Sequence, residues 1–156
     1  MRKRTKRKVY GLITDTMKYV IDGISDTPEA KLNILRAREL SAIEALAKGK
    51  GGINEWRQMT EMLNIAETMG KKGIGPEVLP ICKQAQAELI AAAKRFELTR
   101  RMGLTATGLC AVRELFAYHD AQRTAISRGE YEQAINTTVN RVRSHAIEVV
   151  DVADVV

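Results

Sequence analysis

The sequence predicts an all-α fold, a single-domain bundle of about five helices, and three observations lead to this prediction. Apolar residues recur at spacings of three and four along most of the chain, as they do on one face of a helix. The periodic segments are joined by short loops that contain glycine, and none of them alternates like an interior strand. Aromatic residues make up only 4% of the 156 residues, so Ala, Leu, Ile and Met must fill the core, which suits closely packed helices.

The chain divides into a basic arm at residues 1–8, a helical domain at residues 9–145 and a short tail at residues 146–156. The basic residues of the arm are Arg2, Lys3, Arg4, Lys6, Arg7 and Lys8. Because the arm has no acidic residue to balance them, it is too charged to pack and is expected to be disordered. The tail is rich in Val and acidic residues, and a short strand, a docked extension and a partner-binding segment all remain open for it.

The first two predicted helices differ in how clearly the sequence marks them. Residues 9–24 carry an apolar stripe that fits a helix, although two glycines and several β-branched residues weaken it. The helix expected over residues 26–47 has a clear start, with Asp26 as N-cap, Pro28 in the first turn and an acid three residues after the cap. It is expected to stop at residues 48–52, where three glycines disfavour further helix.

Two further helices follow in the middle of the chain. The helix expected over residues 54–69 carries Trp56 on its apolar stripe. The cleanest stripe of the sequence follows at about residues 78–100, and Pro80 predicts an irregular first turn there. Gly103 is expected to close this helix, with two arginines placed favourably against its dipole.

The helix expected over residues 107–127 has titratable residues inside its apolar stripe. His119 falls in the middle of that stripe and Arg123 at its edge, and Glu39 points inward from the helix at residues 26–47. Since a buried charge is costly unless it is paired, Glu39 is expected to meet His119 or Arg123. We interpret this group as a structural ion pair that fixes how the two helices pack. The alternative is a carboxylate and an imidazole that line a pocket for acid-base chemistry.

The last predicted helix begins with a capping box formed by Ser127 and Glu130 and ends near residue 143. Tyr131 and Val142 lie on the stripe that is expected to face inward. The polar candidates on the opposite face are Gln133, Asn136, Asn140 and Arg143, with Arg141 beside them. Amides and an arginine on one exposed face can contact base edges or phosphates, but an ordinary solvated surface is the simpler explanation.

The formal charge of +6 is concentrated in the arm. Removing the six basic residues of the arm from the total of 25 leaves 19, equal to the 19 acidic residues. The remainder of the chain is therefore neutral by count. Because nucleic-acid readers usually carry their charge on the folded face, this balance weighs against direct DNA or RNA recognition without excluding it.

The sequence lacks the patterns that are typical of several other kinds of site. Cys82 and Cys110 are too few for a metal set or a disulfide framework and favour a reducing compartment. The loops rich in Gly and Lys lack the preceding strand and the spacing of a P-loop, and no zinc spacing is present. No metal or cofactor is therefore expected. No apolar run approaches the roughly 18 to 20 residues of a membrane span, and the N-terminus lacks a signal-peptide pattern.

Two stretches of the sequence carry a family resemblance: residues 35–44 leading into residues 64–69, and residues 101–104 leading into residues 118–120. They resemble small all-helical accessory proteins encoded by phages and prophages of proteobacteria. The resemblance brings no known activity and no functional residue with it. It implies a bacterial cytoplasm and an accessory role, such as transcription control, host takeover or inhibition of host defence.

Together these observations predict a non-enzymatic, phage-type accessory protein that binds a host nucleoprotein or nucleic-acid-processing complex, such as a CRISPR system, and blocks it. The expected mechanism is occlusion by the arm and the Arg-rich C-terminal half. One alternative is a direct DNA- or RNA-binding regulator that uses the arm and the last helix. Another is a small helical enzyme built on Glu39 and His119. The protein is expected in the cytoplasm of the bacterial host and away from membranes, and a homodimer stays open.

Overall fold

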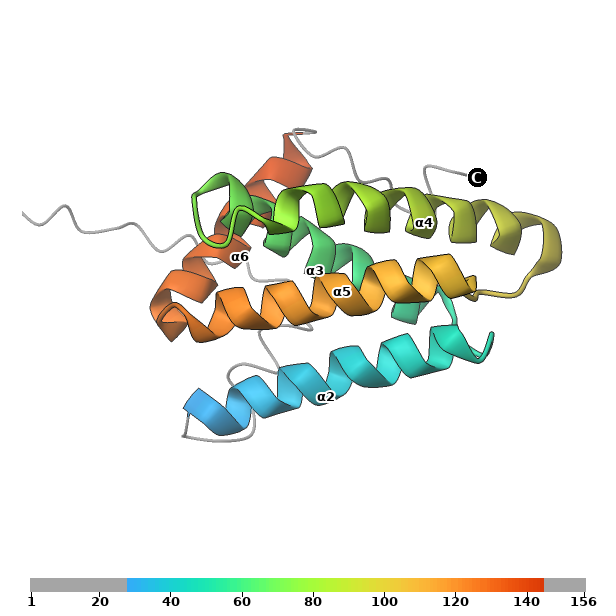
Figure 1. Ribbon diagram of the computed structural model, residues 1–156, viewed down its shortest axis with the longest axis horizontal. Coiled ribbons are helices and arrows are strands. Elements are labelled where there is room, and N and C mark those ends of the chain that lie inside the picture. The colour runs from blue at the N-terminus through green and yellow to red at the C-terminus, as the bar shows by residue number, and fades with distance from the viewer. Residues whose placement is uncertain (1–27, 145–156) are drawn as a thin grey trace, which may run out of the picture.

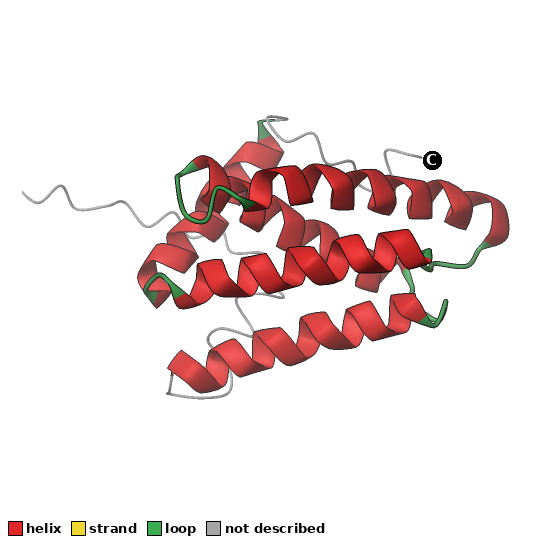
Figure 2. Cartoon of the chain, in the orientation of Figure 1, coloured by secondary structure: helices red, strands yellow, loops and turns green. Residues whose placement is uncertain are grey.

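The computed structural model describes residues 28–144, which form helices and no strand. The helices are α2 (Pro28–Ala47), α3 (Ile53–Lys71), α4 (Val78–Thr99), α5 (Ala106–Thr124) and α6 (Arg128–Arg143). Figures 1 and 2 show them joined by short connections. The predicted all-α class and the five helices after residue 25 are confirmed over this range. The predictions for the arm, for residues 9–24 and for the tail lie outside the described residues.

Helix α3 is the centre of the bundle. It packs against each of α2, α4, α5 and α6, while α2, α5 and α4 lie side by side in front of it in Figure 1. Its buried apolar residues are Trp56, Met59, Met62, Leu63, Ile65, Ala66 and Met69. A single stripe of the kind expected for a surface helix would leave Met62 and Ile65 outside. The structure buries both because α3 has neighbours on several sides.

The core has two parts that meet along α3. The larger part joins residues of α2, α3, α4 and α5, and the smaller part joins the second half of α3 to α6 and to Leu35 of α2. Trp56 is 1% exposed, and its indole N–H donates to the Leu89 carbonyl of α4 at 2.8 Å. This bond satisfies the one polar atom of the largest core side chain, as burial of an indole requires.

Side-chain caps explain where α5 and α6 begin. The Thr105 hydroxyl accepts from the Gly108 N–H at 3.1 Å and opens α5. The Ser127 hydroxyl accepts from the Glu130 N–H at 3.2 Å and opens α6 as predicted. Ser127 therefore belongs to α6, and α5 ends at Thr124, three residues earlier than expected. Before α4, two successive bonds between residues three apart form the irregular start that Pro80 predicted.

The predicted cap of α4 at Gly103 was wrong, although the helix ends within one residue of the expected position. The helix ends at Thr99, and Arg100 adopts the left-handed conformation with φ of 57°. The Arg100 N–H donates to the Phe96 carbonyl at 2.8 Å, which satisfies one of the last free carbonyls of the helix. Gly103 lies beyond this turn and packs against residues of the connection between α2 and α3.

Candidate functional site

The buried charges predicted from the sequence form an ion-pair chain between α2 and α5. The Arg123 guanidinium donates to both oxygens of Glu39, at 2.8 Å each, and to Asp120 at 3.1 Å. Arg36 of α2 donates to the same Asp120 oxygen at 2.7 Å. Glu39 is 6% and Arg123 4% exposed. The predicted burial of both residues is therefore confirmed, and the partner of Glu39 is Arg123 rather than His119.

The two carboxylates of this chain respond differently to their surroundings. Burial raises the pKa of Glu39, although the charge and hydrogen bonds of Arg123 oppose that shift. Partial burial also acts to raise the pKa of Asp120, but the hydrogen bond from Arg36 and the Arg123 charge outweigh it and leave that pKa lowered. A bidentate pair with an arginine uses the acceptor positions that a catalytic carboxylate would offer to a substrate. The arrangement suits a device that sets helix packing.

His119 lies in a second buried network that does not include Glu39. It is fully buried, its Nδ1 lies 3.1 Å from Gln122 Oε1, and its Nε2 lies 3.3 Å from the Tyr131 hydroxyl. The Gln122 amide nitrogen donates to the carbonyls of Ala66 and Ile74 at 3.2 and 2.7 Å. This fixes Oε1 as the atom that faces the imidazole. Nδ1 must then carry the proton, and Nε2 accepts from Tyr131.

Burial, with the nearby Arg123 charge, lowers the pKa of His119 to about 3. The imidazole is therefore neutral near pH 7, and both of its nitrogens are engaged. Burial likewise raises the pKa of Tyr131, with the Arg123 charge opposing the shift. A general base must reach the proton that it removes, and neither nitrogen of His119 is open to solvent. Neither Glu39 nor His119, the carboxylate and imidazole proposed for acid-base chemistry, lines the neighbouring cavity described next.

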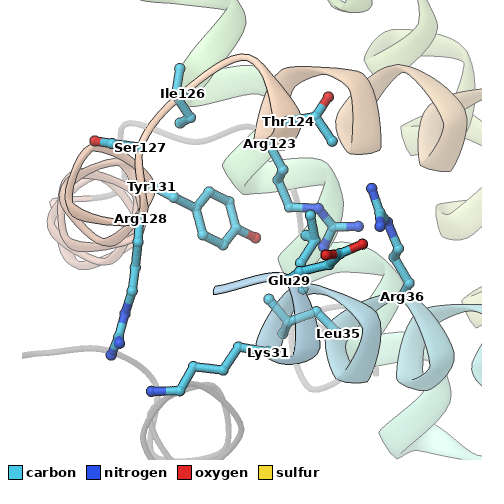
Figure 3. Close-up of a pocket in the computed structure, with 11 residues that line it drawn as sticks. Glu29, Lys31, Leu35, Arg36, Arg123, Thr124, Ile126, Ser127, Arg128 and Tyr131 are labelled. Atoms are coloured by element: carbon cyan, nitrogen blue, oxygen red, sulfur yellow. The ribbon is translucent and has the colours of Figure 1, made fainter. Parts of the chain in front are cut away.

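A cavity of about 350 Å³ lies beside the ion-pair chain, between the first half of α2, the end of α5 and the start of α6. Its lining consists of Glu29, Lys31, Leu32, Leu35, Arg36, Arg123, Thr124, Ile126, Ser127, Arg128 and Tyr131. Figure 3 shows Tyr131 and Arg123 entering it from one side and Leu35 from the other. Three of the four cations in this lining are paired: Arg123 with Glu39, Arg36 with Asp120 and Arg128 with Glu132. The fourth is Lys31, and Glu29 in the same lining carries the opposite charge. The net positive charge that could attract an anion into the cavity is therefore small.

The polar face predicted on α6 is only partly exposed. Asn140 and Arg143 are exposed, but Asn136 is buried, with 7% of its surface exposed. The expectation that it could contact a base edge was wrong. Gln133 is half-buried. Arg141 donates to Glu67 at 2.7 Å and to the Thr68 hydroxyl at 2.7 Å, so it ties α6 to α3.

Val142 differs from its prediction in the opposite sense, because it is more exposed than expected. It was expected to face inward, yet it is 48% exposed. It lies in the last turn of α6, two residues before the end of the described chain. The smaller core ends before this turn, so an apolar periodicity that continues to residue 142 overestimates how far the core extends.

The structure brings together two basic loops that are far apart in the sequence. The connection between α2 and α3, residues 48–52, and the connection between α4 and α5, residues 100–105, meet through an antiparallel bridge between Gly51 and Met102. The Leu104 N–H donates to the Leu46 carbonyl at 3.1 Å. Figure 1 shows both connections at the same end of the bundle. We call this region the basic loop end.

The helical domain itself carries a positive charge. Residues 28–144 contain 18 Lys and Arg against 13 Asp and Glu, a surplus of five. The equal count found for residues 9–156 therefore combines a basic range, residues 28–144, with two more acidic ranges, residues 9–27 and 145–156. The neutral count was the argument against a folded basic surface, and that argument does not hold for the described helices.

Comparison of the chain with protein-family models, with curated proteins and with solved structures found no match in any of the three. Within residues 28–144, no three His, Cys, Asp or Glu side chains are grouped closely enough to hold a metal ion. None of the helices in this range combines the length and apolar character that crossing a membrane requires.

Proposed function

We propose that this chain is a phage-type accessory protein that binds an anionic nucleic-acid-processing complex of a bacterial host and blocks it by occupying its surface. A CRISPR complex is one member of that class. The proposal needs no catalytic group in the chain. It needs a rigid body with a positive surface that can cover a site where the partner handles nucleic acid.

The surplus of five positive charges on residues 28–144 is the observation that carries this proposal. The most buried carboxylate is also neutralised internally, because Glu39 is held by Arg123. Glu67, whose side chain is 12% exposed, is held by both Lys71 and Arg141. Exposed cations thus outnumber exposed acids, and a positive surface speeds association with negatively charged partners.

The arm adds six positive charges to this body. Arm and body together favour a partner with a large negative surface, and such a surface is typical of complexes that carry nucleic acid. Occlusion also fits the buried networks around Glu39 and His119. Both hold helices in register and so provide the rigid surface that a blocking protein presents.

The test is capture of host complexes on the full-length protein, with and without nuclease, followed by an activity assay on the captured complex. We expect retention of a complex whose subunits process nucleic acid, and loss of its activity when purified protein is added. A variant with the six arm cations replaced by Gln should bind more weakly and inhibit at higher concentration. Capture of no such complex, or capture without inhibition, would refute the proposal.

A second candidate is a regulator that binds DNA or RNA directly, and the basic loop end is the observation that favours it. In that case nuclease should remove all captured protein, and purified protein should bind nucleic acid alone. The proposed sequence readout by α6 has less support, because Asn136 is buried and Arg141 is tied to α3. A direct regulator of this kind would therefore bind with little sequence preference.

A further inference from the structure

The basic loop end is built so that its cations stand in a fixed relation to one another. Because the bridge between Gly51 and Met102 is antiparallel, Lys50 lies across from Gly103 and residue 101 lies across from residue 52. Met102 is fully buried and anchors the second loop. A Cβ atom added at Gly103 would lie 3.1 Å from the Gly49 Cα, so glycine is what allows this close approach.

The acids near these loops are mostly engaged. Glu44 pairs with Lys48 at 3.0 Å, and Glu55 accepts from the Gly52 N–H at 2.7 Å at the start of α3. Glu97, in the last turn of α4, is exposed and opposes the cations.

Three exposed cations remain at this end: Lys50, Arg100 and Arg101. Among the described residues, no carboxylate lies within ion-pair distance of any of them.

The helix ends around the cations add no net charge, because α3 and α5 begin here while α2 and α4 end here, and the partial charges of N-termini and C-termini are opposite in sign. Arg100 is held in place by its left-handed turn and by the Phe96 ring, whose centroid lies 6.0 Å from the guanidinium carbon. A cation ordered in this way loses less conformational freedom on binding than a free surface side chain.

We propose that the basic loop end binds the phosphate backbone of nucleic acid without reading the bases. This rests on the proposed function and specifies which part of the partner complex the domain contacts. Duplex DNA presents one charge for about every 1.7 Å of its axis, so three clustered cations find phosphates in any register.

Two features argue against the other ways in which this surface could bind. Single-strand recognition relies on exposed aromatic side chains that stack on bases. The large apolar side chain exposed beside these loops is Leu98, and Phe96 is partly buried. A protein surface with carboxylates would have to match three fixed cations in position, whereas a phosphate backbone supplies acceptors continuously.

The test compares the full-length protein with the triple variant Lys50→Gln, Arg100→Gln, Arg101→Gln, using a short labelled duplex DNA and a duplex RNA of mixed sequence. The matched control, Lys31→Gln, Lys83→Gln, Arg113→Gln, removes the same charge from other parts of the domain. The binding constant K falls as salt rises, and losing three phosphate contacts should make the plot of log K against log salt less steep by about 2.7. Raising the salt from about 50 to about 200 mM should then weaken binding by the loop variant about 40-fold less than binding by the wild type.

We expect the loop variant to lose at least about tenfold in affinity at low salt, and the control variant to lose much less. Equal losses in the two variants would mean that net charge acts without a localised site, and would overturn the inference. A loop variant that keeps duplex binding but no longer captures the nuclease-treated host complex would also overturn it, because the ligand would then be a protein surface. If the wild-type protein captures no complex yet the loop variant alone loses duplex binding, the inference stands and the proposed function fails.

Discussion

The buried imidazole of His119 makes the stability of the helical domain depend on pH. In an unfolded chain a histidine titrates near pH 6.5, whereas burial lowers the pKa of His119 in the folded domain to about 3. Between these two values the unfolded chain binds a proton that the folded domain does not. The contribution of this group is therefore fully present above about pH 7 and is lost progressively as the pH falls from 6.5 towards 3.

The expected magnitude follows from the linkage relation. At pH 5 the unfolded chain is almost fully protonated at this residue and the folded domain is not, so acidification from pH 8 lowers the free energy of unfolding by about 2 kcal/mol. That is a large share of the roughly 5 to 15 kcal/mol of a typical domain. The result at pH 5 hardly depends on the folded pKa as long as that value stays below about 4.

The assay is urea unfolding at several pH values between 5 and 8 for the wild type and for His119→Gln, which cannot titrate. Carboxylates such as Glu39, whose raised pKa acts in the opposite direction, titrate in both proteins and cancel in the difference. We expect the wild type to lose about 2 kcal/mol more than the variant over this range. Parallel pH profiles would show that His119 is protonated or solvated in the folded state, and the reasoning from its burial would be wrong.

Three further predictions concern other features of the domain. Glu39→Ala removes the bidentate partner of the buried Arg123, which keeps only its bond to Asp120, and should lower the free energy of unfolding by about 3 kcal/mol. Glu44→Ala, at a surface pair, should leave the melting temperature nearly unchanged. Thermal unfolding measures both variants, and equal shifts would contradict this. The exposed Cys110 should react with a thiol reagent at once, whereas Cys82, whose thiol pKa burial raises to about 12, should react only on unfolding. Rapid reaction of both thiols in the native protein would contradict this. Arg100→Gly relieves a left-handed conformation and should stabilise the domain by up to about 1 kcal/mol while weakening duplex binding; a lower urea midpoint would refute the strain argument.

The helices were predictable because their signals are local. Apolar periodicity and N-caps such as Ser127 depend on a few neighbouring residues, and tertiary packing did not override them. The ion pair was also predictable, since Glu39 and Arg123 each lie within an apolar stripe of the sequence and a buried charge needs a partner. The sequence left open whether Glu39 would meet Arg123 or His119, because that choice depends on the rotation of α2 against α5.

The errors arose where a residue's surroundings are set by elements distant in sequence. Asn136 lies opposite the main stripe of α6, yet it is buried, and the stripe alone gives no sign of contacts on that side of the helix. The extra buried face of α3 was missed for the same reason, since one stripe does not show how many neighbours a helix has. The left-handed cap of α4 at Arg100 was missed because glycine is the usual left-handed residue, and Gly103 was available three residues later.

The basic loop end shows how bundle topology can turn sequence motifs into a surface. In a bundle whose successive helices run up and down, α2 and α4 end on the same side, and Figure 1 shows that arrangement. The loops at residues 48–52 and 100–105 are basic and contain glycine. Their meeting therefore follows from helix order alone, once the helices are recognised. The net charge does not reveal this cluster of cations, because a count over the whole chain gives the same total whether the cations are clustered or dispersed. The position of the loops in the fold, more than the formal charge, supports a phosphate-binding surface.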